Sequence, residues 1–164
     1  MIEVGMSSSR SSTEVADPKT DIGNVEMASS IDFVVNTITV SKDPAEWEIN
    51  DATINFLLSM SEIAQNLDED FSTTRTFSSS LNAYRSLSKN VFKRKLQNGQ
   101  EVNRKYLCFS VSKKALFCIP CLLFGGRSLK FGLDGYTDWN NINSGLNHHE
   151  NSDEHMKCLT AFSI

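Results

Sequence analysis

The sequence lacks the features of an exported or membrane-spanning protein. Its N-terminus has no basic start followed by an apolar stretch and a small-residue cleavage site, so it does not match a secretory signal. The longest apolar run, FCIPCLLF at residues 117–124, is far shorter than the roughly 18 residues that indicate a membrane span. We therefore expect a soluble protein that does not act in a membrane.

Cysteine and histidine are scarce and are confined to the C-terminal part. The 164 residues include four cysteines and three histidines, namely Cys108, Cys118, Cys121, Cys158, His148, His149 and His155. Because no export signal is present, a reducing compartment is expected, in the cytosol or the nucleus. There, spaced cysteines indicate metal or catalytic chemistry rather than disulfides.

Acidic residues are almost missing from one part of the chain. Residues 84–130 hold eleven Lys and Arg against the single acid Glu101, whereas residues 1–83 hold 14 acids against four basic residues. The formal net charge of −4 therefore hides a strongly basic block. The pI of the whole chain is a poor guide to its partners.

The composition predicts three regions. Residues 1–44 are rich in serine and acids and poor in apolar residues, which predicts a disordered tail. Residues 45–84 form an acidic leader, in which apolar residues at helical spacing predict an amphipathic helix at 51–65, capped by Asp51. We expect this helix to pack on the downstream domain; a docking helix for a protein partner is the alternative. Residues 85–162 form the third region.

Two hairpins are predicted at the start of this third region. The first contains residues 91–96 and ends in Asn98-Gly99, a strong turn signal between extended segments. The second spans residues 105–118; its alternation places Leu107, Phe109 and Val111 on one face and Tyr106, Cys108 and Ser110 on the other. This hairpin leads directly into Cys-x-x-Cys.

Two cysteines and two histidines at compatible spacings predict a zinc site. Cys118 and Cys121 are separated by two residues, so one turn can direct both sulfurs at the same ion. His149 and His155 have five residues between them, within the range typical of histidine pairs in zinc fingers. This interval corresponds to about 600° on a straight helix, which would put the two rings on different faces. The helix must therefore break between them.

The sequence offers such a break at Asn151-Ser152, because both residues are good N-caps. We expect His149 near the end of a helix that begins at Trp139, after the capping residue Asp138. We expect His155 in the first turn of the next helix.

Alternatives to this ligand set stay open. Cys118-Ile119-Pro120-Cys121 is also similar to a thioredoxin-type redox pair, although the LLFGG that follows is a poor helix start. Cys158 lies three residues after His155 and could be the fourth ligand instead. Cys108 is expected to be a packed residue, and His148 an ordinary surface histidine.

These residues carry a resemblance to a known family. The segments that carry it are residues 98–110, 116–124, 138–139 and 149–155, with a similar leader at 43–47, 66–68 and 75–78. Over residues 43–160 the chain resembles the TTF-type zinc finger of hAT-superfamily transposases and their domesticated MYM-type zinc finger-like relatives. Tyr106 stands where that family more often has Trp.

The resemblance implies a small α+β zinc finger that binds DNA, with Cys118, Cys121, His149 and His155 as zinc ligands. The RNase H-like catalytic domain of a transposase is not in these 164 residues, so we expect no strand-transfer chemistry. We interpret the chain as a fragment, a truncated copy or a free-standing finger of a transposable element. The nucleus is the expected compartment.

A basic surface on the hairpins is the expected DNA contact. It consists of Lys93, Arg94, Lys95, Arg104, Lys105, Lys113 and Lys114. If all seven neutralised phosphates, log K would fall with log salt at a slope of about −6. A surface that neutralises the chain's own acids, or a zinc-scaffolded protein-interaction module, is the alternative. An enzyme is not expected, because two cysteines and two histidines fill a tetrahedral zinc, and no small-molecule substrate is predicted.

Overall fold

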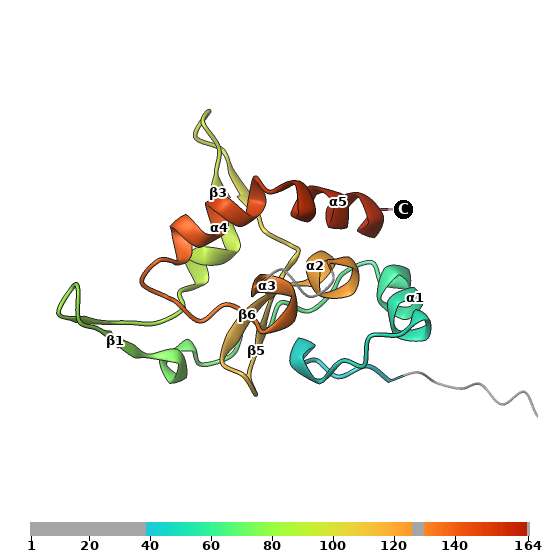
Figure 1. Ribbon diagram of the computed structural model, residues 1–164, viewed down its shortest axis with the longest axis horizontal. Helices are drawn as coiled ribbons and strands as arrows, with labels where there is room; N and C mark the ends of the chain where they lie inside the picture. Colours follow the sequence, from blue (N-terminus) through green and yellow to red (C-terminus); the bar gives the residue numbers. More distant parts are fainter. Residues whose placement is uncertain (1–38, 126–129, 164) are drawn as a thin grey trace, which may run out of the picture. The chain divides into compact units, whose positions relative to one another are not determined.

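The computed structural model describes residues 39–125 and 130–163 (Figure 1). In this part of the chain, one α-helix is followed by three two-stranded hairpins and then by four short α-helices. The helices are α1 (Asp51–Ser59), α2 (Ile119–Phe124), α3 (Lys130–Leu133), α4 (Ile142–Glu150) and α5 (Asp153–Phe162), with 3-10 turns at Pro44–Glu46, Phe71–Thr74 and Lys89–Phe92. The antiparallel pairs are β1 (Thr76–Ser78) with β2 (Ala83–Arg85), β3 (Lys93–Lys95) with β4 (Glu101–Asn103), and β5 (Leu107–Ser110) with β6 (Ala115–Cys118). The predicted small α+β fold is confirmed. Most of the predicted disordered tail lies outside the described residues.

Both predicted hairpins are present. In the first, Arg94 pairs with Val102, and Gly99 takes the positive φ of +85° that glycine allows without steric strain. In the second, Leu107 pairs with Cys118, so the end of β6 brings this cysteine beside the start of β5.

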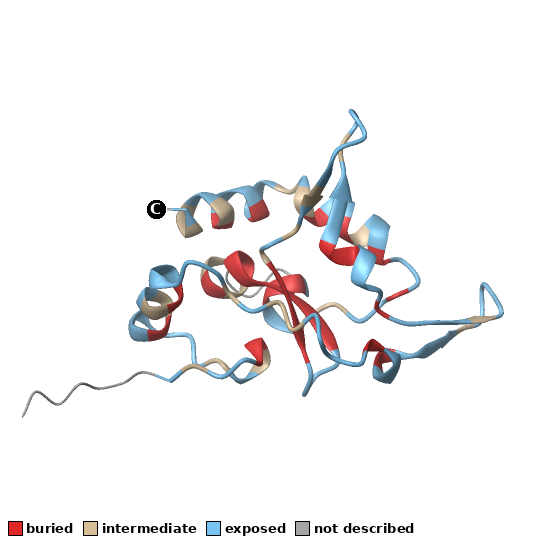
Figure 2. Cartoon of the chain, turned by 180° about the vertical axis from the view of Figure 1, so that it is seen from behind, coloured by how far each residue is buried: buried red, intermediate tan, exposed pale blue. Residues whose placement is uncertain are grey.

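The β5–β6 hairpin forms the centre of the core. Leu107 and Phe109 contact one apolar cluster, whereas Cys108 contacts a second, so the predicted alternation holds but both faces are buried. Val111 is the exception, because it follows the strand and is exposed. Figure 2 shows the buried residues on β5, β6 and α2, whereas the β1–β2 and β3–β4 hairpins are mostly exposed.

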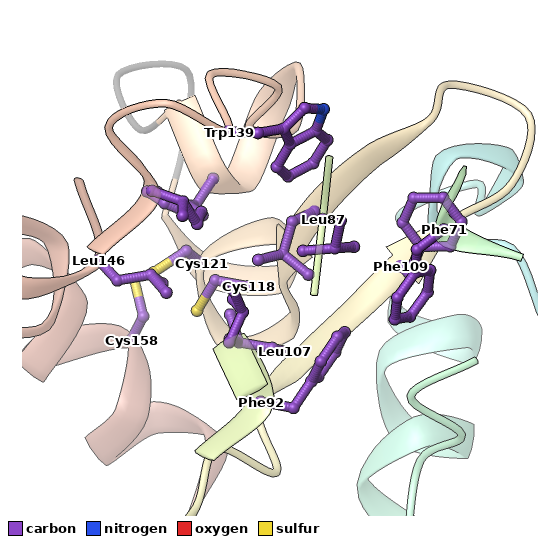
Figure 3. Close-up of a cluster of buried hydrophobic side chains, with 14 residues drawn as sticks. Phe71, Leu87, Phe92, Leu107, Phe109, Cys118, Cys121, Trp139, Leu146 and Cys158 are labelled. Atoms are coloured by element: carbon purple, nitrogen blue, oxygen red, sulfur yellow. The ribbon is translucent and has the colours of Figure 1, made fainter. Parts of the chain in front are cut away.

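The first cluster connects the cysteines to the aromatic residues. In Figure 3, Cys118, Cys121 and Cys158 lie at one end, and Phe71 and Phe109 lie at the other. Phe71 contacts Phe109 edge to face, with the ring centroids 5.1 Å apart.

The leader helix is shorter than predicted. Its N-cap is Asn50, whose side chain accepts a hydrogen bond from Thr53 N at 2.9 Å, and α1 ends at Ser59 rather than at residue 65. Leu57 nevertheless packs with Ile119 and Leu123 in the second cluster. The predicted packing of this helix on the downstream residues is therefore confirmed.

Side-chain amides fix the segment after α1 to the central hairpin. Gln65 Nε2 donates to the carbonyls of Arg104 and Leu107 at 2.7 and 2.9 Å. Asn66 Nδ2 donates to the carbonyls of Lys42 and Phe109 at 2.8 and 2.7 Å. The bonds to Arg104, Leu107 and Phe109 join residues about forty positions apart in the sequence.

The expectation of a poor helix start after Cys121 is wrong. Helix α2 begins at Ile119, directly after Cys118, and ends at Phe124. Pro120 is tolerated because the first turn of a helix leaves its N–H groups without intrahelical partners. Burial of Ile119, Pro120, Cys121 and Leu123 stabilises this short helix. Among the described residues, none of the helices has the length and apolar character needed to cross a bilayer.

Candidate metal centre

A break between α4 and α5 positions the two histidines. His149 lies in the last turn of α4 and His155 in the first turn of α5, as predicted. Ser152 makes the junction: its Oγ accepts a hydrogen bond from His155 N at 3.3 Å and donates to His149 O at 2.8 Å. Helix α4 itself begins at Ile142, three residues later than predicted.

The delayed start of α4 has a local cause. The Asp138 carboxylate accepts hydrogen bonds from the backbone and side-chain N–H groups of Asn141, so it caps a turn that precedes the helix. Trp139 lies in this turn and is 4% exposed. The tryptophan therefore contributes to the core without being helical.

The four predicted ligands meet at one point. Their donor atoms, the sulfurs of Cys118 and Cys121 and one ring nitrogen each of His149 and His155, all lie within 4.8 Å of one another. His155 Nδ1 is 3.5 Å from Cys118 Sγ and 3.3 Å from Cys121 Sγ. His149 Nε2 is 3.5 Å from Cys121 Sγ.

These distances fit a tetrahedral ion. With metal–sulfur bonds near 2.3 Å and metal–nitrogen bonds near 2.0–2.1 Å, tetrahedral angles place sulfur and nitrogen about 3.6 Å apart. The three observed sulfur–nitrogen distances, 3.3–3.5 Å, lie close to this value. The donor set of two thiols and two imidazoles is one that structural zinc sites use.

The site is buried, which favours the uncharged form of the His149 imidazole. Burial, together with His155, lowers the pKa of His149 to about 4, so its imidazole is neutral at neutral pH, the form that binds metals. The Cys121 thiol shares a hydrogen bond with Cys118 and is buried, and both effects raise its pKa. A bound cation acts in the opposite direction and deprotonates a coordinating thiol.

Aromatic rings surround the histidines. The ring centroids of Phe131, in α3, and His149 are 4.6 Å apart, and those of Tyr106 and His155 are 5.2 Å apart. The close approach of α3 depends on Gly132, because a Cβ atom there would lie 2.6 Å from Cys121 O. The rings therefore limit the movement of the imidazoles.

A carboxylate next to His149 joins helices α4 and α5, here called the histidine arm, to the hairpins. The side chain of Glu150 is 6% exposed, and it accepts hydrogen bonds from Arg104 Nε at 2.6 Å, from Arg104 Nη2 at 3.3 Å and from the Tyr106 hydroxyl. Arg94 lies 3.8 Å from the same carboxylate. Burial alone raises the pKa of Glu150, but the hydrogen bonds from Arg104 and Tyr106 outweigh it and hold the pKa below its ordinary value. No signal in the sequence indicated this contact across 46 positions.

The other cysteines and His148 lie outside the group of four. Cys108 is buried in the second cluster, and its Sγ donates to Ala64 O at 3.1 Å, as expected for a packed residue. Cys158 is buried in the first cluster near Cys121, and burial is the main cause that raises its pKa to about 11. His148 is exposed on α4.

The seven predicted basic residues do not form one surface. Lys93, Arg94 and Lys95 lie together on exposed β3, whereas Lys113 and Lys114 lie in the β5–β6 turn, at the opposite end of the view in Figure 1. Lys105 is exposed and lies 3.9 Å from Glu62. The side chain of Arg104 is only 12% exposed and is used by Glu150.

Comparisons with known proteins agree with a zinc-finger relationship over part of the chain. The chain is 34% identical over 83 residues to Zinc finger MYM-type protein 5 of Homo sapiens and of Macaca fascicularis. These 83 residues are 50% of this chain and 12% of each relative. The Mus musculus protein of the same name is 32% identical over 82 residues. The chain thus spans about an eighth of the length of these curated relatives. No protein-family model matches the chain, and no solved structure matches it.

Proposed function

We propose that the chain is a zinc-dependent DNA-binding module in which Cys118, Cys121, His149 and His155 hold one Zn²⁺. The observation that carries this proposal is the convergence of the four donor atoms at the distances of a tetrahedral ion. Similarity to a MYM-type zinc finger protein supports the same metal. With four protein donors the ion has no open position for water, so its role is structural rather than enzymatic.

Metal content and cobalt spectroscopy test the zinc site. The purified full chain is expected to contain one zinc per molecule. Replacing it with Co²⁺ should give the visible spectrum of a tetrahedral site together with the charge-transfer band of two thiolates. Metal-free protein that is fully folded, or an octahedral cobalt spectrum, would contradict the proposal.

The exposed β3–β4 hairpin is the proposed DNA contact. Lys93, Arg94 and Lys95 occupy three consecutive exposed positions, and the hairpin is connected to the metal site through Arg94 and Glu150. Its only acid is Glu101, which lies 3.9 Å from Lys93. Attraction to phosphates would give affinity with little dependence on sequence.

The placement of the basic residues changes the expected salt dependence. If only the three residues of β3 contact phosphates, the slope of log K against log salt should be about −3, rather than the −6 expected for all seven. Reversing Lys93 and Lys95 to Glu should strongly reduce duplex binding, measured by fluorescence anisotropy at several salt concentrations. Arg94 is kept because it lies 3.8 Å from the Glu150 carboxylate. Reversing Lys113 and Lys114, which lie in the β5–β6 turn away from β3 (Figure 1), is the matched control and should have little effect.

A protein-interaction module without direct DNA binding is the second candidate. It is favoured by three exposed apolar residues in and beside α1, namely Ile49, Leu58 and Met60, which are 40%, 37% and 43% exposed. In that case, the reversal of the β3 residues would leave partner capture intact, and substitution of Leu58 and Met60 would abolish it.

We also propose that the finger is of the TTF type, derived from a hAT-superfamily transposase, and acts in the nucleus. The spacing of the four ligands and the leader segments support this origin. An open reading frame that continues from this segment into an RNase H-like domain would support it strongly. A fluorescent fusion of the chain should accumulate in the nucleus, and exclusion from the nucleus would contradict the proposed location.

A further inference from the structure

The β1–β2 hairpin carries aromatic rings that the fold does not use. Phe77 and Tyr84 form a cross-strand pair, and each is 56% exposed. Leu81, in the turn between the strands, is 50% exposed. None of the three belongs to the two buried clusters. In Figure 1 this hairpin extends to the left, away from β5 and β6.

The two rings and an arginine form an ordered group on one face. The ring centroids of Phe77 and Tyr84 are 5.2 Å apart in an edge-to-face arrangement. The Arg75 guanidinium lies over the Tyr84 ring, 4.2 Å from its centroid. A stacked cation and a neighbouring ring hold Tyr84 in place, so the group is pre-organised while remaining in contact with solvent.

The charged residues of the hairpin itself have one sign. Residues 71–100 contain no acidic side chain, and Arg75 and Arg85 flank the aromatic pair. The carboxylate of Asp70, the preceding acid, accepts hydrogen bonds from the backbone N–H and the hydroxyl of Ser72. The remaining exposed positions of the hairpin are mostly serine, threonine and asparagine, which can contact a polar backbone without opposing charge.

We propose that the β1–β2 hairpin binds single-stranded nucleic acid, with bases stacking on Phe77 and Tyr84 and phosphates near Arg75 and Arg85. Exposed aromatic rings beside cationic side chains are the means by which many proteins bind single strands. This surface is separate from β3, so the proposal does not depend on duplex binding by Lys93, Arg94 and Lys95.

The observations favour a single strand over a duplex or a protein. The bases of a duplex are already stacked, and separating a base step costs a few kcal/mol, whereas a single strand offers its base faces freely. An aromatic protein-docking surface requires no particular charge, whereas the flanking arginines and the absence of acids from the hairpin itself match a phosphate backbone.

Anisotropy of a labelled single strand tests the proposal on the full chain. Stacking is worth about 1–3 kcal/mol per base, so the double substitution Phe77→Ala and Tyr84→Ala should weaken binding by at least about 10-fold. Affinity for a duplex of the same sequence should change by less than about 2-fold. The pair Phe77→Tyr and Tyr84→Phe keeps both rings and should retain binding, as should Leu81→Ala, an apolar control on the same hairpin.

Three results of the binding measurements would overturn the proposal. They are no measurable binding of a single strand by the unmodified chain, equal affinity after the double alanine substitution, and equal losses for single strand and duplex. Failure of the β3 charge reversal to reduce duplex binding would contradict the duplex proposal alone. If the alanine substitutions change the oligomeric mass of the protein in solution but not its affinity for the single strand, the hairpin is a surface for self-association and the inference is wrong.

Discussion

Glu150 is the side chain through which the histidine arm is held against the hairpins. It follows His149 directly and binds Arg104 with both carboxylate oxygens, while Arg104 also donates to the carbonyls of Val91 and Lys93. The position of His149 therefore depends on a buried ion pair as well as on the packing of α4. Removing one partner of such a pair leaves the other charge buried without compensation.

Substitution Glu150→Gln should lower the free energy of unfolding by about 2–3 kcal/mol, because Arg104 loses a charged acceptor while the shape is kept. Chemical denaturation of the metal-loaded chain measures the effect. The control is Glu101→Gln, whose exposed carboxylate lies 3.9 Å from Lys93 and should contribute less than about 1 kcal/mol. Equal effects of the two substitutions would show that the Glu150 network does not stabilise the fold.

Cys158 is a control for the proposed thiol ligands, since it is buried like Cys118: the two residues are 4% and 0% exposed. Substitution Cys118→Ala should weaken metal binding by at least about 100-fold, beyond the range for residues that only support ligands. Cys158→Ala should leave the cobalt charge-transfer band unchanged. A smaller band after Cys158→Ala would show that three thiolates bind the ion and that the proposed ligand set is wrong.

Short-range sequence signals predicted the hairpins and the helix break well, because their causes are local. Asn98-Gly99 provides the positive φ of its turn, and the Ser152 side chain caps the first turn of α5. The predicted end of the leader helix and the expectation of a poor helix start after Cys121 were wrong, because tertiary packing determines where α1 ends and where α2 begins. Ile63 keeps its contact with the second cluster without being helical.

The contacts of the leader with the central hairpin could not be predicted from sequence. Gln65 and Asn66 carry no periodic signal, yet their amides satisfy backbone carbonyls around β5. The same holds for Asp43, whose carboxylate accepts a hydrogen bond from Ser112 N at 2.8 Å. Each of these bonds joins elements that come together only in the folded chain.

Substitution Asn66→Ala tests whether the leader is fixed in this way. Asn66 has a φ of +58°, and Asn82 has a similar φ of +47°, but the Asn82 side chain makes no hydrogen bond with any described residue. Both alanine variants therefore introduce similar backbone strain, and only Asn66→Ala removes side-chain hydrogen bonds, two to carbonyls and a longer one to Cys108 Sγ at 3.6 Å. Asn66→Ala should destabilise the chain by about 1–3 kcal/mol more than Asn82→Ala in thermal or chemical unfolding. Equal losses would mean that the amide does not hold the leader.

On the scale of the whole molecule, the proposed metal site and the hydrophobic core are one unit. Cys118 and Cys121 belong to the first cluster, and α2, which follows Cys118 and contains Cys121, packs Ile119 and Leu123 against α1 in the second. An ion bound by the four ligands would therefore connect the hairpin, the histidine arm and the leader.

Removal of zinc with a chelator should unfold residues 85–162, and the leader helix α1 should unfold with them. Structural zinc contributes about 10–16 kcal/mol of binding free energy, which is as large as the usual free energy of unfolding of a whole domain, about 5–15 kcal/mol. Circular dichroism should report the loss of structure, and hydrogen exchange should show that the amides of α1 and α5 lose protection together. Adding Zn²⁺ back should restore both signals. Near-native circular dichroism after complete zinc removal would contradict a metal-dependent fold, and protection retained in α1 alone would show that the leader folds independently.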